Sequence, residues 1–301
     1  MTVGAVRQEW EAMELLLFDA FNGLIQGAFY ALMALGLSLI ISLNSVINFA
    51  HGGFMVVGAY LAYTLAPYIG FWGALVAGPV LAGFIGIIVE RTLVSHMYGR
   101  PDPIYSLLLT FGFALIIEDV VRTIWGAQGV PFEIPSALNS PVSTTYFFVT
   151  GYRLFVIAAI AFATIALFAF LRLSRFGIRI RAGILDLETV SALGVNVYLL
   201  RSVNFAIGTL LAGFAGVLAA GILQLAPTMG DDVIMATFVA VVVGGIGSLF
   251  GSVLGGLLIG LAAGVTTAYY PAASDVVIYI IMAVVLIVRP RGLLGQEGLF
   301  E

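Results

Sequence analysis

The sequence contains no cysteine, and its twelve basic residues are all arginine because lysine is absent as well. Without cysteine the chain can form no disulfide, no thiolate nucleophile and no cysteine-ligated metal centre. Without lysine it can form neither a Schiff base nor the phosphate-binding loop of nucleotide hydrolases, whose lysine reaches the nucleotide phosphates. The two histidines, His51 and His96, lie far apart in the sequence, which argues against a metal site. We therefore expect no catalytic site, no cofactor and no ATP hydrolysis in this chain itself.

Charge is scarce throughout the chain. Charged residues make up 9% of its 301 residues and hydrophobic residues 61%, whereas about a quarter of the residues in ordinary globular proteins are charged. A water-soluble fold of this length could not bury so much apolar surface, so the solvent is a lipid bilayer. The 36 glycines suit closely packed membrane helices. We expect one all-α integral membrane domain over residues 1–301, without a soluble appendage.

Long apolar runs divide the sequence into membrane-spanning segments. Each run approaches the roughly 20 residues that an α-helix needs to cross the hydrocarbon. The runs cover residues 20–43, 46–65, 70–89, 104–125, 152–172, 203–224, 233–250, 251–270 and 274–289. The sequence predicts about nine transmembrane helices, with eight and ten as alternatives. The shorter runs and the adjoining pair at 233–270 are candidates for broken or re-entrant helices.

The arginines are distributed unevenly between the polar segments. With nine spans and the N-terminus outside, residues 90–103, 173–202 and the C-terminus lie in the cytoplasm. In or beside these segments are Arg91, Arg100, Arg172, Arg175, Arg179, Arg181, Arg201, Arg289 and Arg291, whereas only Arg7, Arg122 and Arg153 lie toward the other face. This bias fits the positive-inside rule. The tryptophans then fall near the outer interface, at Trp10, Trp72 and Trp125.

Small residues recur at four-residue spacing on several spans. They are Gly23, Gly27 and Ala31 on the first span, and Gly247, Gly251, Gly255, Gly256, Gly260 and Gly264 near the end. Such stripes let helix backbones approach closely in a bilayer. They predict helix–helix contacts, with the lining of a transport pathway as the alternative.

Ionisable residues interrupt the apolar run at 104–125. Glu118 and Asp119 would be costly inside a membrane, which makes them functional candidates. Arg122 follows one helical turn later, however, so local neutralisation is available. The spacing favours a structural ion pair over a transport site.

A polar break without charged residues separates the first two apolar runs, at residues 42–53, and a second, glycine-rich break lies at 243–252. Irregular backbone at membrane depth is tolerated where protein buries it or where it lines a wet cavity, and broken helices often form substrate sites in transporters. We take the polar and glycine residues of the first break as candidates for the substrate pathway: Asn44, Asn48, His51, Gly52 and Gly53. The alternative is a tight interfacial turn in which His51 hydrogen-bonds to a carbonyl group.

The polar segment 173–202 is unusually long for a cytoplasmic connection in so apolar a chain. Residues 182–193 can form a three-turn helix with an apolar side, and Gly194 can supply a left-handed C-terminal cap. A short helix of this kind suits a groove on a partner protein. The alternative is a helix lying on lipid headgroups, which its two acidic residues disfavour.

Four stretches carry a resemblance to a known family. They are Asn-Phe-Ala-His-Gly at 48–52 with the preceding 27–36; Arg181-Ala182, Asp186 and Leu193-Gly194-Val195-Asn196; Val243-Gly-Gly-Ile-Gly-Ser248 with Gly251, Gly255 and Gly256; and the ending 288–295. In this order and spacing they resemble the Liv-type permeases of bacterial branched-chain amino acid ABC importers, specifically the shorter, H-like subunit. The likeness runs from about residue 20 to residue 295.

The resemblance implies an ABC importer permease that works as a heterodimer with a second, related permease. Two cytoplasmic ATPase subunits would bind the ATP, and an extracytoplasmic binding protein would deliver the substrate. It also implies that Arg181, Ala182, Asp186 and Gly194 belong to the helix that docks on an ATPase. Lipid surrounds the spans, and we expect no nucleic-acid partner.

The function implied is that of a multi-pass transport subunit of the bacterial plasma (inner) membrane, which translocates branched-chain amino acids or related small polar solutes. Members of the family also carry urea, short amides and aromatic acids, so the substrate stays open. The alternative is a secondary transporter driven by an ion gradient. It would need coupling carboxylates or a sodium site, and its candidates, Glu118 and Asp119, have a neutralising arginine beside them.

Overall fold

The computed structural model describes residues 3–100, 102–143 and 148–295, with side chains from residue 13 onward. The α-helices are α1 (Val3–Asn44), α2 (His51–Thr92), α3 (Ile104–Trp125), α4 (Gly151–Leu173), α5 (Arg175–Leu185), α6 (Leu187–Ala192), α7 (Val197–Ala220), α8 (Met229–Gly244), α9 (Leu249–Tyr269) and α10 (Ser274–Val288). Short 3-10 helices are η1 (Val94–Met97), η2 (Ser136–Leu138) and η3 (Pro271–Ala273), and the strands are β1 (Pro141–Ser143) and β2 (Phe148–Thr150). The predicted outer positions of the N-terminus, Arg7 and Trp10 lie outside the described side chains.

Seven of the described helices are long and apolar enough to cross a membrane, and α2 is one of them. It contains a break at Gly70, whose φ of 72° and ψ of 169° are not helical. Its two halves pack against each other, because a Cβ atom on Gly78 would lie 2.6 Å from the carbonyl oxygen of Gly58. The hairpin α2 therefore supplies both spans predicted at 46–65 and 70–89. With the shorter α8, the described helices agree with the predicted number of about nine.

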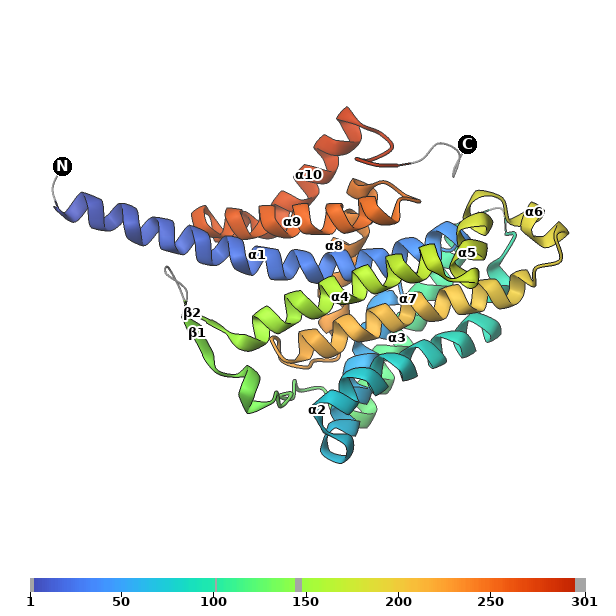
Figure 1. Ribbon diagram of the computed structural model, residues 1–301, viewed down its shortest axis with the longest axis horizontal. Helices are drawn as coiled ribbons and strands as arrows, with labels where there is room; N and C mark the ends of the chain where they lie inside the picture. The colour runs from blue at the N-terminus through green and yellow to red at the C-terminus, as the bar shows by residue number, and fades with distance from the viewer. Residues whose placement is uncertain (1–2, 101, 144–147, 296–301) are drawn as a thin grey trace.

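The core is built where α7 lies between α1 and the α2 hairpin (Figure 1). Glycine makes both contacts close. A Cβ atom on Gly58 would lie 2.3 Å from the Cα of Gly213 in α7, and one on Gly208 would lie 2.8 Å from the carbonyl oxygen of Gly36 in α1. No larger residue fits at these crossings without a backbone shift, so small side chains set the distance between the helices.

The contact between α1 and α9 confirms the predicted small-residue stripes. A Cβ atom on Gly260 would lie 2.2 Å from the Cα of Gly27, and one on Gly264 would lie 2.5 Å from the Cα of Gly23. Gly256 meets Ala31 in the same way, with a Cβ–N distance of 2.4 Å. The two stripes therefore face each other, and dispersion between close backbones holds the helices together where lipid offers no hydrophobic driving force.

Two local predictions are also confirmed. Arg122 forms an ion pair with Glu118, one turn apart on α3. The glycine-rich break at 243–252 separates α8 from α9, where Gly245 and Gly247 have φ values of 105° and 88°. These are left-handed conformations that glycine adopts without strain.

Several helix ends differ from the predicted ones. α1 begins by Val3 rather than at residue 20, because the acidic stretch before the apolar run is rich in strong helix formers. α7 begins at Val197 rather than at 203, since the side chain of Asn196 accepts a hydrogen bond from the backbone N–H of Leu199 and caps the helix there. Hydropathy marks the apolar part of a helix, and these helices extend beyond it.

The outer segment, which we define as residues 126–151 and predict to lie outside, and the α5–α6 pair lie toward opposite ends of the molecule (Figure 1). The outer segment contains a small antiparallel hairpin in which Val142 of β1 is opposite Val149 of β2. The sequence did not predict these strands, because three residues are too few to give an alternating pattern. Apart from an isolated bridge between Val130 and Leu225, the regular secondary structure of the described part is otherwise helical, as expected.

Candidate functional site

The first break is a re-entrant connection. Asn44 ends α1 and its side chain contacts the backbone of Arg201. His51 begins α2, yet its Nε2 donates to the carbonyl oxygen of Met33 at 3.1 Å. Met33 lies about three helical turns before the end of α1. Residues 45–50 therefore fold back along α1 into the interior. The bond from His51 to a carbonyl group, which was expected for a tight interfacial turn, is present, but the connection reaches deeper than such a turn.

Helix α3 satisfies the backbone of this connection. The backbone N–H of Phe49 donates to Thr110 Oγ at 3.0 Å, and the Thr110 hydroxyl lies 3.0 Å from the carbonyl oxygen of Ile47. The Phe49 ring stacks on Phe238 of α8, with ring centroids 4.6 Å apart. Irregular backbone at this depth is therefore buried by protein, which is one of the two conditions under which a membrane interior tolerates it.

Two side chains of the connection are buried with unused polar atoms. Asn48 is fully buried, and neither its Oδ1 nor its Nδ2 has a hydrogen-bond partner among the described residues. His51 is fully buried too, and its Nδ1 has no partner there. Native proteins pair most buried polar groups. The Asn48 amide therefore lowers the stability of this conformation. We expect it to find hydrogen-bond partners in a different conformation of the connection.

The glycines of the break form a different contact. A Cβ atom on Gly52 would lie 2.6 Å from the carbonyl oxygen of Gly230, and one on Gly53 would lie 2.9 Å from Ile117. Gly52 and Gly230 open α2 and α8, so the two helix N-termini touch. The five predicted pathway residues thus fall into three separate environments rather than lining one cavity: Asn44 at the end of α1, Asn48 against α3, and His51 with the glycines between α1, α8 and α3.

A buried carboxylate joins α2 to α7 near Asn44. Glu90 is 2% exposed. Its Oε1 accepts a hydrogen bond from the Tyr98 hydroxyl at 2.7 Å, and its Oε2 accepts one from the Ser202 hydroxyl at 2.6 Å. Burial, and then the bond to Glu90, raise the pKa of the Tyr98 hydroxyl. The hydroxyl therefore keeps its proton at neutral pH and remains a donor.

Asn44 extends this network to α1. Its Nδ2 donates to the Tyr98 hydroxyl oxygen at 2.6 Å, and its Oδ1 accepts from Asn204 Nδ2 at 2.9 Å. The Arg201 guanidinium lies over the Tyr98 ring, 4.1 Å from its centroid. We call these residues, with Glu90 and Ser202, the cytoplasmic network, after the face on which the sequence predicts segments 90–103 and 173–202. It ties together α1, α2, α7 and the segment after η1.

The predicted helix at 182–193 is wrong in one respect. The structure has two helices, α5 and α6, separated at Asp186, whose φ of −157° and ψ of 100° are extended. The Asp186 side chain accepts from the backbone N–H of Thr189 at 3.0 Å and from its hydroxyl, and so caps α6. These bonds hold the pKa of the Asp186 carboxyl below its usual value. An aspartate that can cap ends one helix and starts the next.

The other predicted coupling residues lie around these two helices. Gly194 has a φ of 82° and donates from its backbone N–H to Ser191 at 2.9 Å, so it caps α6 in the left-handed conformation that was predicted. Arg181 is exposed on α5, whereas Ala182 is half-buried against the protein's own core. Arg181 also lines a groove of about 340 Å³ between α5 and the turn at 247–250. The segment 173–202 and the second break are thus neighbours.

Large apolar side chains are exposed at both ends of α6. Leu185 is 80% exposed and Leu193 is 78% exposed. They lie on a polar loop rather than on a membrane-spanning helix, so lipid tails do not account for their exposure. Their exposure makes this loop a candidate for a protein–protein contact.

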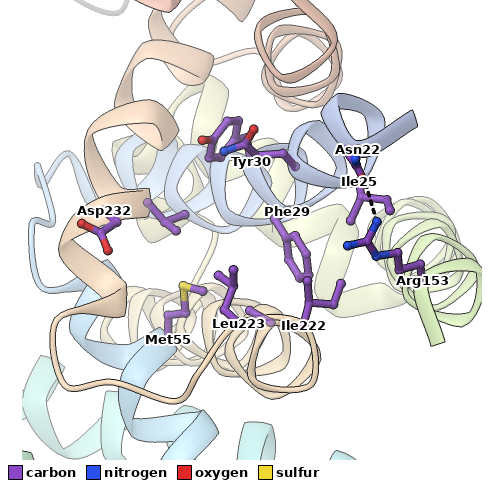
Figure 2. A pocket seen from close by; sticks show the side chains of 12 residues that line it. Asn22, Ile25, Phe29, Tyr30, Met55, Arg153, Ile222, Leu223 and Asp232 are labelled. Atoms are coloured by element: carbon purple, nitrogen blue, oxygen red, sulfur yellow. Dashed lines mark hydrogen bonds between the residues drawn. The ribbon is translucent and has the colours of Figure 1, made fainter. Parts of the chain in front are cut away.

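A pocket of about 400 Å³ opens between α1, α2, α4, α7 and α8, and we call it the outer pocket because the sequence predicts its Arg153 toward the outer face. Its walls are mostly apolar, with Phe29, Met55 and Ile222 among them (Figure 2). Polar groups stand at its two ends: Arg153 with Asn22 at one, and Asp232 at the other. The Arg153 guanidinium donates to Asn22 Oδ1.

Sequence reasoning missed the outer pocket and the cytoplasmic network. Arg153 entered only as one of three outer arginines, although an ionisable residue in the first turn of a span is itself a signal. Glu90 ends an apolar run and resembles an ordinary interfacial residue. Its partner Ser202 lies 112 positions away, and nothing in the sequence connects the two.

Comparison with known proteins identifies the family. Residues 20–286 match the family described as "Branched-chain amino acid transport system / permease component". The chain belongs to this family. It is therefore a multi-pass membrane permease subunit and not an enzyme, as the sequence predicted.

Individual members of the branched-chain permease family agree with this. The high-affinity branched-chain amino acid permease protein LivH of Salmonella typhimurium is 32% identical over 294 residues, which cover 92% of this chain and 94% of the relative. LivH of Escherichia coli K12 is also 32% identical, over 295 residues with the same coverage. BraD of Pseudomonas aeruginosa is 29% identical over 292 residues, covering 91% of this chain and 94% of BraD.

Among solved structures, PsaBC from Streptococcus pneumoniae in complex with Fab is 13% identical, with a TM-score of 0.46 and 89% of each chain covered. That likeness is too low to carry an argument.

Proposed function

We propose that this chain is the membrane-spanning subunit of an ATP-driven importer for branched-chain amino acids or closely related small solutes. It works with a second, related permease, two cytoplasmic ATPases that bind the ATP, and an extracytoplasmic binding protein. The names of the relatives supply the substrate class. The contacts of the chain itself support the proposed coupling route.

One observation carries the coupling route. The α5–α6 pair continues directly into α7, and the first turns of α7 carry Arg201 and Ser202. Ser202 bonds to Glu90 of α2, and Asn44 at the end of α1 bonds to the Arg201 carbonyl. A push on α6 would therefore reach the start of the re-entrant connection through the first turns of α7 and these hydrogen bonds.

The docking of an ATPase on α6 rests on exposure and shape. Leu185 and Leu193 offer apolar contacts at its two ends. The groove beside Arg181 offers space for an inserted side chain. An amphipathic element received in a groove is a common mode of recognition between proteins.

The proposed orientation has α5–α6 in the cytoplasm and the hairpin β1–β2 outside. Trp72, Trp125 and Glu133 line one recess at the hairpin's end of the molecule, and aromatic residues gather at membrane interfaces. The exposed arginines Arg175, Arg179 and Arg181 lie on α5 at the other end. The N-terminus is then outside, and the C-terminus is cytoplasmic.

In this mechanism the ATPases close on binding nucleotide and move α5–α6. The cytoplasmic network transmits the motion to α1 and α2, and the connection 45–50 leaves its place against α3. Asn48 would then gain polar partners, either water or the passing solute. In the conformation described above the connection is packed against α3 and α8, and we propose that it closes the cytoplasmic half of the pathway there.

Reconstitution tests the proposal. The complete complex is placed in proteoliposomes with leucine-loaded binding protein on the extracytoplasmic side, and leucine uptake is measured with ATP supplied to the ATPase side. The matched controls are ATPase subunits without catalytic activity, and ionophores that collapse proton and sodium gradients.

Uptake that needs ATP hydrolysis and survives the ionophores is the expected result. Uptake that continues with inactive ATPases and stops with the ionophores would replace this proposal by a secondary transporter. Isoleucine, valine, urea and acetamide with their own binding proteins extend the same assay to the substrate class.

A further inference from the structure

We infer that the outer pocket is a binding site for a small aliphatic amino acid zwitterion, with Arg153 as the group that recognises the carboxylate. The inference rests on the proposed function and adds a solute site within the permease, between delivery from outside and release to the cytoplasm.

Size and composition suit such a ligand. The volume of about 400 Å³ lies within the roughly 300–1,000 Å³ of small-molecule sites, which combine apolar walls with a few placed polar groups. Phe29 and Met55 are 7% and 0% exposed, so the apolar wall is part of the packed core and is preformed. Ile222 and Leu223 also line the pocket, on the same side as Met55 (Figure 2). A branched aliphatic side chain would lie between these walls.

Arg153 is placed to recognise a carboxylate. It is the third residue of α4 and is half-buried. Its side chain reaches across to α1, where Asn22 Oδ1 accepts one of its hydrogen bonds. No acidic residue forms a salt bridge with Arg153 among the described side chains. A guanidinium presents five N–H donors in a fixed fork that fits a carboxylate with two parallel bonds. Among the described side chains, the bond to Asn22 uses one of these donors, and Figure 2 shows the guanidinium at the edge of the pocket.

The opposite end of the pocket has the complementary charge. Asp232 lies across the cavity from Arg153 (Figure 2), in the first turn of α8, and is exposed. Between them, the Tyr30 hydroxyl is hydrogen-bonded with the Gln26 side chain. Both side chains line the same pocket. An amino acid bound with its carboxylate at Arg153 would turn its ammonium group toward these oxygens and the negative end of the site. A simple cation or anion would face the wrong charge at one end.

The position of the pocket suits an intermediate binding site on the transport pathway. Met55 of the pocket wall lies just after the re-entrant connection in the sequence, since α2 begins at His51. A solute in the outer pocket is thus separated from the cytoplasmic network by the packed connection 45–50. Release of that connection is the step that the ATPases would drive.

The test uses the cysteine-free background of the native chain. Leu223→Cys places a thiol at the pocket, and its labelling by a charged thiosulfonate reagent is measured in the assembled permease complex without binding protein. The ligands are millimolar leucine, leucinamide, which lacks the carboxylate, and 4-methylpentanoate, which lacks the ammonium. Ser136→Cys, in the exposed outer segment, is the control thiol for effects outside the pocket.

We expect leucine to slow labelling of Leu223→Cys at least fivefold, 4-methylpentanoate to slow it less, and leucinamide to have no effect. Labelling of Ser136→Cys should not change with any of them. Equal protection by leucine and leucinamide would overturn the carboxylate assignment. Protection by none of the three ligands would overturn the site.

Variants of Arg153 distinguish recognition of the ligand carboxylate from anchoring of α4 at the membrane interface. Arg153→Lys keeps the positive charge but loses the fork, and Arg153→Gln loses both. Both should abolish protection by leucine and lower ATP-driven uptake at least tenfold, with complex assembly and ATP hydrolysis retained. Arg122→Gln, an outer arginine of α3 paired with Glu118, is the matched control and should transport normally.

Arg153→Lys with wild-type uptake and protection would reduce Arg153 to an interfacial anchor. In that case the proposed function stands, because wild-type uptake still requires ATP. A separate result would contradict the proposed function, namely a wild-type complex that shows no ATP-dependent uptake.

Discussion

The Ser202 hydroxyl donates a 2.6 Å hydrogen bond to the buried carboxylate of Glu90, although the two residues are 112 positions apart in the sequence. Ser202 belongs to the helix that leaves the α5–α6 segment, and Glu90 belongs to the returning half of the α2 hairpin. The bond therefore connects the cytoplasmic loop to the helices that flank the re-entrant connection. Bonds to a buried charge are among the stronger ones in proteins.

The first prediction concerns this bond. Glu90→Gln and Ser202→Ala should each lower the stability of the complex by about 1.5–3 kcal/mol, the usual contribution of a hydrogen bond to a charged group. Each should also reduce leucine transported per ATP hydrolysed, because motion of α7 no longer moves α2. The double variant should be no worse than Glu90→Gln alone, since the two residues share one interaction. Fully additive losses in thermal melting and in uptake would show that the two residues act independently.

The second prediction separates stability from transport at Asn48. Replacing this fully buried side chain, whose polar atoms have no partner, by the similarly sized leucine removes an unpaired amide from the core. Asn48→Leu should therefore melt at the same temperature as the wild type or higher, yet transport at least tenfold more slowly, because the amide is needed when the connection opens. Thermal melting and leucine uptake in the same preparation measure both effects. A variant that melts higher and transports normally would mean that Asn48 has no role in transport.

The third prediction concerns the left-handed cap of α6. No atom lies within 4 Å of a Cβ atom built on Gly194, so only its φ of 82° opposes a side chain. Gly194→Val should cost about 1–3 kcal/mol of local strain, the usual range for non-glycine residues in such conformations. It should weaken copurification of the ATPases and leave the spans folded in detergent. Gly194→Asn is the matched control, because asparagine tolerates this conformation. Equal copurification with valine and asparagine would show that the cap geometry is unimportant for docking.

The fourth prediction concerns orientation. Single cysteines at Ser136 and Ser191 should react with a membrane-impermeant reagent from opposite sides in oriented vesicles, Ser136 from outside and Ser191 from the cytoplasm. Both residues are exposed, so accessibility does not limit the reaction. Labelling of Ser136 from the cytoplasmic side alone would invert the proposed topology.

The membrane architecture could be predicted from the sequence because each of its signals is local. A run of apolar residues marks a span, and a glycine every fourth residue marks a helix contact, as Gly23 and Gly27 do against α9. Arg122 one turn after Glu118 marks an ion pair. Gly194 marks a cap. In each case the decisive residues lie within one or two helical turns of one another.

The remaining features depend on contacts between distant segments or on competition between local choices. Asp186 is compatible with a continuous helix until its side chain bonds to Thr189, and the cap then ends α5. The path of residues 45–50 depends on Thr110, which lies on another helix. Arg153 becomes part of a pocket only when α4 packs beside Asn22 of α1. Pattern and propensity carry no information about such pairings.

The fifth prediction tests the central claim, that α6 transmits the work of ATP hydrolysis into this chain. Leu193, 78% exposed at the end of α6, is changed to aspartate, with Leu193→Met as the apolar control. The measurement is the number of leucine molecules imported per ATP hydrolysed by the reconstituted complex. We expect Leu193→Asp to lower this ratio at least fivefold or to release the ATPases, and Leu193→Met to leave it unchanged. An unchanged ratio with fully assembled ATPases in Leu193→Asp would contradict the account.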